Sequence, residues 1–222
     1  MLENFGIIDP WIYALGALMI VLAPGPSMLY VLKASLTAGR RAGAAAILGV
    51  MLGDSLLIFL AYIGIAAAIK AHPEVFFWIK AAGGLYLAWL GVKVLWETHA
   101  AKKKASGEAF DRPVGAYGDR NRAVFKAFRT ALALTLTNPK SILFYVSFFI
   151  QFIDETSAHT GISYLILALI LQMISVTVLS LVVTLGADGL RRLARFPGVA
   201  KLGSTALGSL FLFFAGKLVL EA

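Results

Sequence analysis

The 222-residue sequence contains no cysteine, which excludes disulfides and thiolate metal sites. Its three histidines, His72, His99 and His159, lie between separate apolar segments and are not expected to converge on a metal ion. The sequence also lacks a phosphate-binding glycine loop, a dinucleotide-binding fingerprint, a nucleophile elbow and a metalloprotease motif. We therefore expect no cofactor, no metal and no catalytic residues.

Charge is scarce as well, because charged residues make up 14% of the chain and hydrophobic residues 59%, with a mean hydropathy of +0.83. This composition is typical of an integral membrane protein. A spanning helix needs about 20 mainly apolar residues. Six segments meet this requirement: Trp11–Leu32, Ala42–Ile69, Val75–Trp96, Phe128–Phe152, Ser163–Gly186 and Leu202–Leu220. We predict an all-α integral membrane protein with one transmembrane domain over residues 1–222.

The basic residues predict how the chain is oriented. The net charge is +8, and 16 of the 20 lysines and arginines lie in or beside the loops that follow the first, third and fifth segments. Because basic residues favour the cytoplasmic side, both termini are predicted outside and the odd-numbered loops inside. The charge is thus interpreted as a topology signal, aided by membrane lipid, and not as a nucleic-acid-binding surface. Residues 1–4 lack the basic region of a signal peptide, so the first helix is expected to be retained.

Two of the six segments carry a helix-breaking motif. The first contains Pro24, Gly25, Pro26 and Ser27, and the fourth contains Asn138-Pro139-Lys140-Ser141. Proline removes a helical hydrogen bond, so both helices should be interrupted at membrane depth. Such interruptions in corresponding places of two halves are typical of the binding sites of secondary transporters. A kink that serves only packing is the alternative interpretation.

The two halves show weak self-similarity in the same order. Residues 24–30 align with 138–144, Asp54 falls near Gln172, and residues 83–87 align with 208–212. Three segments per half would make the repeat an inverted one. We predict a 3+3 inverted repeat with halves of about 1–96 and 125–222, joined by a basic cytoplasmic loop of about 97–124.

Asp54 is a carboxyl group in the middle of the second segment. An unpaired charge there is costly, so Asp54 must face a partner, a cavity or a proton. Since burial disfavours its charged form, Asp54 is a candidate to take up and release protons. A structural hydrogen bond between helices is the alternative.

Lys140 is at comparable depth in the fourth segment. An ion pair with Asp54, or with a substrate carboxylate, would compensate for the cost of burying the Lys140 charge. Protonation of Asp54 would then free Lys140 to hold a carboxylate, which couples the two groups. The alternative interpretation is a static ion pair between Asp54 and Lys140 that only neutralises their charges.

Further polar residues at this depth are candidate liners of a substrate site. The half-helix ends near Pro24–Pro26 and Asn138–Lys140 could bind substrate charges. Ser27, Ser141 and Gln172 could line the pocket, or could equally form hydrogen bonds between helices. Gly49 and Gly53 predict close packing of the second helix. Glycine-rich faces on the second, third and sixth segments would permit a homodimer.

These residues resemble the LysE/RhtB superfamily of bacterial amino-acid exporters over essentially the whole chain. The resemblance rests on Pro24-Gly25-Pro26, Gly53-Asp54 and Asn138-Pro139-Lys140. Residues 138–149, 151–154, 21–33 and 159–163 are similar to the leucine-exporting members. The resemblance implies export of leucine and related apolar amino acids across the bacterial inner membrane, driven by protons. Family members commonly have Asn or Asp where this chain has Ser27, so we expect this position to influence selectivity.

Three functions other than leucine export are compatible with the same sequence. An exporter of threonine, homoserine or another amino acid would share the same site. A membrane-embedded enzyme would use Asp54 as acid or base and Lys140 as nucleophile or oxyanion partner. A passive channel would show neither saturation nor proton coupling, and would give no reason for two interrupted helices.

Overall fold

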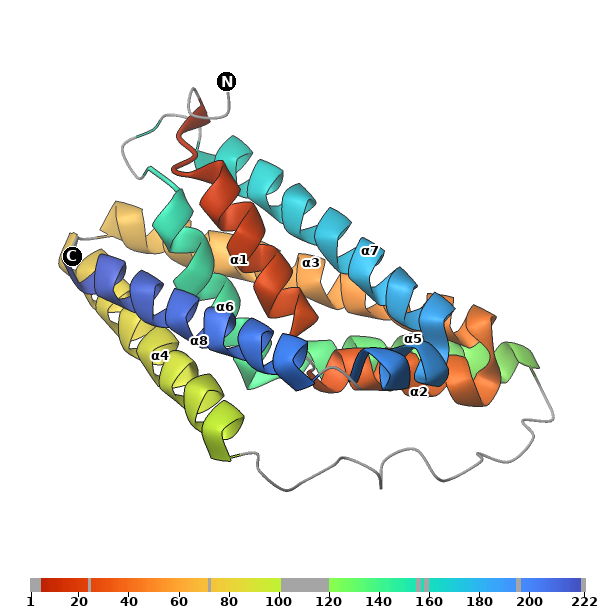
Figure 1. Cartoon of the computed structure of the whole chain (residues 1–222). Helices are drawn as coiled ribbons and strands as arrows, with labels where there is room; N and C mark the ends of the chain where they lie inside the picture. The colour runs from red at the N-terminus through yellow and green to blue at the C-terminus, as the bar shows by residue number, and fades with distance from the viewer. Residues whose placement is uncertain are drawn as a thin grey trace.

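The computed structural model describes residues 5–23, 25–71, 73–100, 120–154, 157, 160–194 and 197–220. Every regular element in these ranges is a helix, which confirms the all-α class (Figure 1). The elements are α1 (Pro10–Leu22), α2 (Pro26–Ala38), α3 (Arg40–Ala71), α4 (Pro73–Ala100), α5 (Arg120–Leu136), α6 (Pro139–Phe149), the 3-10 helix η2 (Ile150–Phe152), α7 (Thr160–Ala194) and α8 (Pro197–Leu220). Most of the predicted loop 97–124 lies outside the described residues.

Proline begins five of these helices, namely α1, α2, α4, α6 and α8. The first position suits proline because its amide has no intrahelical acceptor there and its φ is already helical. Pro26 and Pro139 thus start the helices that follow the two interruptions. The chain leaves helical geometry after Leu22 and again at Asn138, close to both predicted motifs. Pro24 itself lies outside the described residues.

The lengths of the helices support part of the predicted membrane layout. Within the described residues, Arg40–Ala67 and Thr160–Gly186 are long and apolar enough to cross a membrane. Helices α1 and α2 qualify together if they form one span, with a bend of 55° between them. Shorter apolar helices cover Ser141–Phe152 and Thr205–Lys217. The remaining spans of the six-span layout stay a prediction.

The buried side chains form two hydrophobic clusters, one on each side of the interruptions. The larger cluster joins α1, α4, α6, α8, the second half of α3 and the first half of α7. The smaller one joins α2, α5, the first half of α3 and the second half of α7. Figure 1 shows α3 and α7 running the length of the molecule, while α1 and α6 lie toward one end and α2 and α5 toward the other. The interruptions therefore fall where the two clusters meet.

Glycines bring several helices unusually close together. A Cβ on Gly49 would lie 2.3 Å from the Phe128 carbonyl oxygen, and one on Gly53 would lie 2.8 Å from the Thr135 side chain. The predicted close packing of the second helix is thus made against α5. Gly91 and Gly208 similarly bring α4 and α8 together, each with its Cβ position about 3 Å from the other's carbonyl oxygen. These four glycines serve packing within the chain, and the homodimer stays a prediction.

Candidate functional site

A cavity of about 110 Å³ lies where the two clusters meet, and both interruptions line it. Gly25 and Ser27 come from the first interruption, and Asn138 and Ser141 come from the second. Asp54 reaches the same cavity from α3. The other lining residues are Ile20, Val21, Ala23, Met28, Val50, Phe144, Tyr145, Leu171, Ser175 and Leu179. Five residues proposed from the sequence are thus brought together, although Ser27 and Ser141 are 114 positions apart.

Three helix ends meet at this cavity. Gly25 and Asn138 are the residues immediately before α2 and α6, so the amino-terminal ends of both helices face it. A helix amino terminus carries partial positive charge and unpaired amides, which favour an anionic group. The carboxyl-terminal end of α1 contributes Ile20, Val21 and Ala23. Pro24 and Pro26 have no amide hydrogen to offer the Ile20 and Leu22 carbonyls, so that end favours a cation.

A hydrogen bond links the two interrupted regions directly. The Ser27 and Thr135 hydroxyl oxygens are 3.2 Å apart and join α2 to α5. Thr135 is buried, and its carbonyl oxygen accepts the Asn138 amide at 3.2 Å in the turn that ends α5. The break after α5 is therefore a tight turn whose backbone is hydrogen-bonded. This link fixes Ser27 at the cavity edge.

Asp54 is buried on α3, with 6% of its surface exposed. The Tyr145 side chain of α6 lines the same cavity, close enough to interact with the Asp54 carboxyl group. Tyr145 was not among the residues proposed from the sequence. A signal was available, because Tyr145 lies four positions after Ser141 and so shares its helix face. The pair connects the long helix α3 to the helix that begins at the second interruption.

Other predicted site residues take different places. Pro26 and Pro139 are exposed at the first positions of α2 and α6, and neither is among the described residues that line the cavity. Lys140 is the second residue of α6, but its side chain lies outside the described part of the structure. The ion pair between Asp54 and Lys140 therefore stays a prediction.

Gln172 forms a link between helices instead of lining this cavity, as far as the described side chains define it. Its Nε2 donates to the Met51 carbonyl oxygen at 2.9 Å and to Ser55 Oγ at 2.8 Å, joining α7 to α3. Ser175, one helical turn further along α7, lines the cavity in its place. Helical residues three apart share a face, so the position of Ser175 at the cavity could have been predicted from its spacing to Gln172.

Replacing Gln172 by Leu should therefore weaken the fold slightly and leave transport intact. Hydrogen bonds between membrane helices contribute about 0.6 kcal/mol on average, so the loss of two gives a small fall in Tm. The check is Tm of the purified variant in detergent, beside its transport rate in cells. A strong loss of transport at unchanged stability would instead give Gln172 a direct role in the site.

The groups at the cavity suit binding better than covalent chemistry. They comprise one carboxylate, a phenol, three serine hydroxyls, an asparagine amide and an apolar wall. Among the described residues, no three His, Cys, Asp or Glu side chains gather in a way that could hold a metal ion. With opposite helix ends at one small cavity, the arrangement fits a small molecule that carries both a positive and a negative charge.

Comparisons with known proteins agree with this arrangement. The family model described as LysE type translocator matches residues 18–222, and the chain belongs to this family. It is a membrane-embedded transporter and not an enzyme.

Among curated proteins, the leucine efflux protein of Salmonella typhimurium strain LT2 is 43% identical over 218 residues, which cover 98% of both chains. The leucine efflux proteins of Enterobacter sp. strain 638 and Klebsiella pneumoniae are 42% and 37% identical over the same length. No solved structure matches the chain.

Proposed function

We propose that the protein is a secondary transporter that exports leucine and related apolar amino acids, by antiport with protons. The main support is the convergence of both helix interruptions and Asp54 on one cavity. The leucine efflux proteins, similar over 98% of their length, favour leucine as the substrate. The cavity is smaller than the roughly 300–1,000 Å³ of drug-sized sites, which suits a small substrate.

The cavity offers a separate place for each part of a zwitterionic amino acid. The substrate carboxylate would lie at the amino-terminal ends of α2 and α6, near Ser27 and Ser141, with Lys140 as an additional partner. The substrate ammonium would lie at the carboxyl-terminal end of α1, close to Asp54. The apolar side chain would contact Leu171 and Leu179.

Alternating access would follow from movement of the two hydrophobic clusters about this cavity. Entry of a proton from outside would neutralise Asp54 and change its bonds to Tyr145 and Lys140. Substrate and proton would thereby compete for the same group, which is the requirement for antiport.

The membrane layout is proposed as six spans in two inverted halves. The long helix α3 packs along α5 and α6 of the other half as well as α2 of its own half, and α7 packs along α1 and α2 of the other half. Contacts between the two halves are compatible with an inverted repeat. Both termini would be outside, with the basic loops in the cytoplasm of a bacterium.

The direct test is amino-acid release from cells that overproduce the protein and are loaded with a mixed set of dipeptides. We expect rapid release of leucine and its apolar analogues, and little release in cells carrying Lys140→Ala. Preferential release of threonine or homoserine would still identify an amino-acid exporter. It would indicate that the three serines at the cavity determine substrate selectivity. Wild-type cells that release no amino acid faster than empty-vector cells would contradict the proposal.

A further inference from the structure

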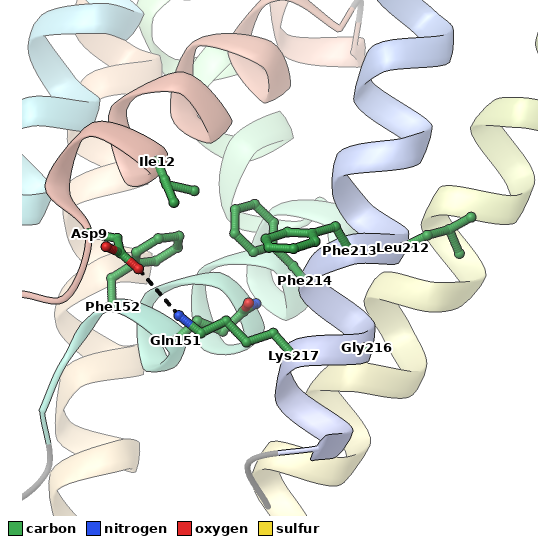
Figure 2. Close-up of a pocket in the computed structure, with 9 residues that line it drawn as sticks. All are labelled: Asp9, Ile12, Gln151, Phe152, Leu212, Phe213, Phe214, Gly216 and Lys217. Carbon is green, nitrogen blue, oxygen red and sulfur yellow. Dashed lines mark hydrogen bonds and ion pairs between the residues drawn. The ribbon is translucent and has the colours of Figure 1, made fainter.

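A second and larger cavity, of about 500 Å³, lies away from the site already described. It is bounded by the start of α1, by η2 and by the last turns of α8 (Figure 2). Its polar lining residues are Asp9, Gln151 and Lys217, and its apolar walls include Ile12, Phe152 and Phe214. This volume is within the roughly 300–1,000 Å³ of small-molecule sites.

The cavity contains one positive and one negative side chain, loosely paired. Lys217 Nζ lies 3.5 Å from Asp9 Oδ2, with 22% and 49% of the respective side chains exposed. Charge-assisted hydrogen bonds are usually about 2.7–2.9 Å long. Each partner can therefore accept another ionic group at little cost. The dashed line in Figure 2 marks this pair.

Asp9 is held in position by its backbone and is not occupied as a helix cap. It precedes α1 and has a φ of 46°, in the left-handed region, where Asp is one of the few residues tolerated. An aspartate at this position usually accepts a hydrogen bond from the first turn, but the Asp9 carboxylate makes no such bond. Its carboxylate is thus directed toward Lys217.

Gln151 supplies a buried acceptor to the same cavity. Its side-chain Nε2 donates to the Ser147 carbonyl oxygen at 3.0 Å. Its Oε1 has no hydrogen-bond partner among the described residues, although Gln151 is only 7% exposed. An unpaired buried carbonyl costs about 1–3 kcal/mol, so it favours a ligand that brings a donor. In Figure 2 its amide lies beside the Lys217 side chain.

We propose that this second cavity is a release site for the exported amino acid. The substrate ammonium binds the Asp9 carboxylate and Gln151 Oε1, its carboxylate binds Lys217, and its apolar side chain packs against Phe152 and Phe214. The choice of ligand rests on the proposed function. An opposite-charge pair, a spare acceptor and aromatic walls match an apolar zwitterion.

A row of aromatic rings in contact lies between the two cavities. Phe144 lines the central cavity, and Phe152 and Phe214 line the second. Phe148 lies between them, with ring centroids 4.7 Å from Phe144 and 5.0 Å from Phe152. A substrate that moves directly from the central cavity to Asp9 and Lys217 would have to displace these rings. The second cavity is therefore separated from the central cavity by these side chains. It lies at the end of the molecule that the charge distribution predicts to be outside.

The test is equilibrium binding of radiolabelled leucine to the purified full-length protein in nanodiscs. We expect two leucines per wild-type chain and one in Lys217→Gln or Asp9→Asn. The matched control Glu74→Gln, an exposed carboxylate at the start of α4, should keep two. Lys217→Arg should also keep two, because it retains the positive charge.

A competition experiment on the wild-type protein avoids any question of folding. Leucinamide lacks the carboxylate and 4-methylpentanoate lacks the ammonium. Neither compound should therefore displace leucine from the second cavity of the wild-type protein. One leucine per wild-type chain, or two retained in both charge variants, would overturn the release site. The proposed function fails separately, by the absence of leucine release from wild-type cells.

Discussion

Asp54→Asn is expected to reduce leucine export at least about tenfold, a difference of about 1.4 kcal/mol in the transport step. The substitution keeps the size of the side chain but removes its ability to exchange a proton. Asp54 is buried at the cavity, and Tyr145 lines the cavity beside it. The measurement is leucine release from dipeptide-loaded cells, with protein amounts matched by immunoblot.

A second measurement separates proton coupling from binding. In proteoliposomes with an imposed pH gradient, wild-type leucine flux should follow the gradient, whereas flux through Asp54→Asn should not respond to it. Tyr145→Phe, which removes the hydroxyl group beside Asp54, should give an intermediate loss with the proton response retained. Glu74→Gln changes an exposed carboxylate in the same way and should export normally. An Asp54→Asn protein with wild-type export and unchanged proton dependence would refute the coupling.

Gly49→Ala is expected to cause the largest loss of stability among single-methyl substitutions in α3. The added Cβ would lie 2.3 Å from the Phe128 carbonyl oxygen and 3.1 Å from the Ala131 Cβ, so α5 must move away. Overpacking of this kind costs about 1–3 kcal/mol. For a chain of this length each kcal/mol lowers Tm by about 2–4 °C. Unfolding in detergent, followed by size-exclusion chromatography after heating, measures the shift.

Gly64→Ala is the matched control for this prediction. Gly64 lies in the same helix, and no heavy atom comes within 4 Å of its Cβ position. Both substitutions add one methyl group and raise helix propensity equally, so the difference between them reports packing alone. Equal Tm values for the two variants would show that α3 and α5 do not approach as closely as described. We also expect reduced export in Gly49→Ala, because α3 carries Asp54 into the cavity.

The helix interruptions could be predicted from the sequence because their cause is local. Proline cannot donate a backbone hydrogen bond, so Pro26 and Pro139 fix where α2 and α6 begin. The ends of these helices were harder to predict. Hydropathy ended the first segment at Leu32, whereas α2 continues to Ala38 and stops at Gly39, whose φ is 85°. Apolar length marks the part of a helix suited to lipid, and a glycine marks where helical geometry ends.

Much of the central cavity was accessible to sequence reasoning, and the second cavity was not. Asp54 and the two motifs stood out because polar and helix-breaking residues are costly in an apolar segment. Asp9 and Lys217 lie near segment ends, where charges are unremarkable, and 208 positions separate them. Only tertiary packing brings them together. Gln172 shows the reverse case, since a polar residue at membrane depth serves to join two helices.

The apolar wall of the central cavity has a consequence for how this protein could acquire new substrates. Leu171 and Leu179 line the cavity and are also buried members of the two hydrophobic clusters. Shortening either to admit a bulkier compound would remove core packing, at a cost of about 2–5 kcal/mol. Ser27 and Ser141 line the same cavity but belong to neither cluster. Natural variation in specificity should therefore accumulate at the serines, while the leucines vary only together with compensating changes elsewhere in the core.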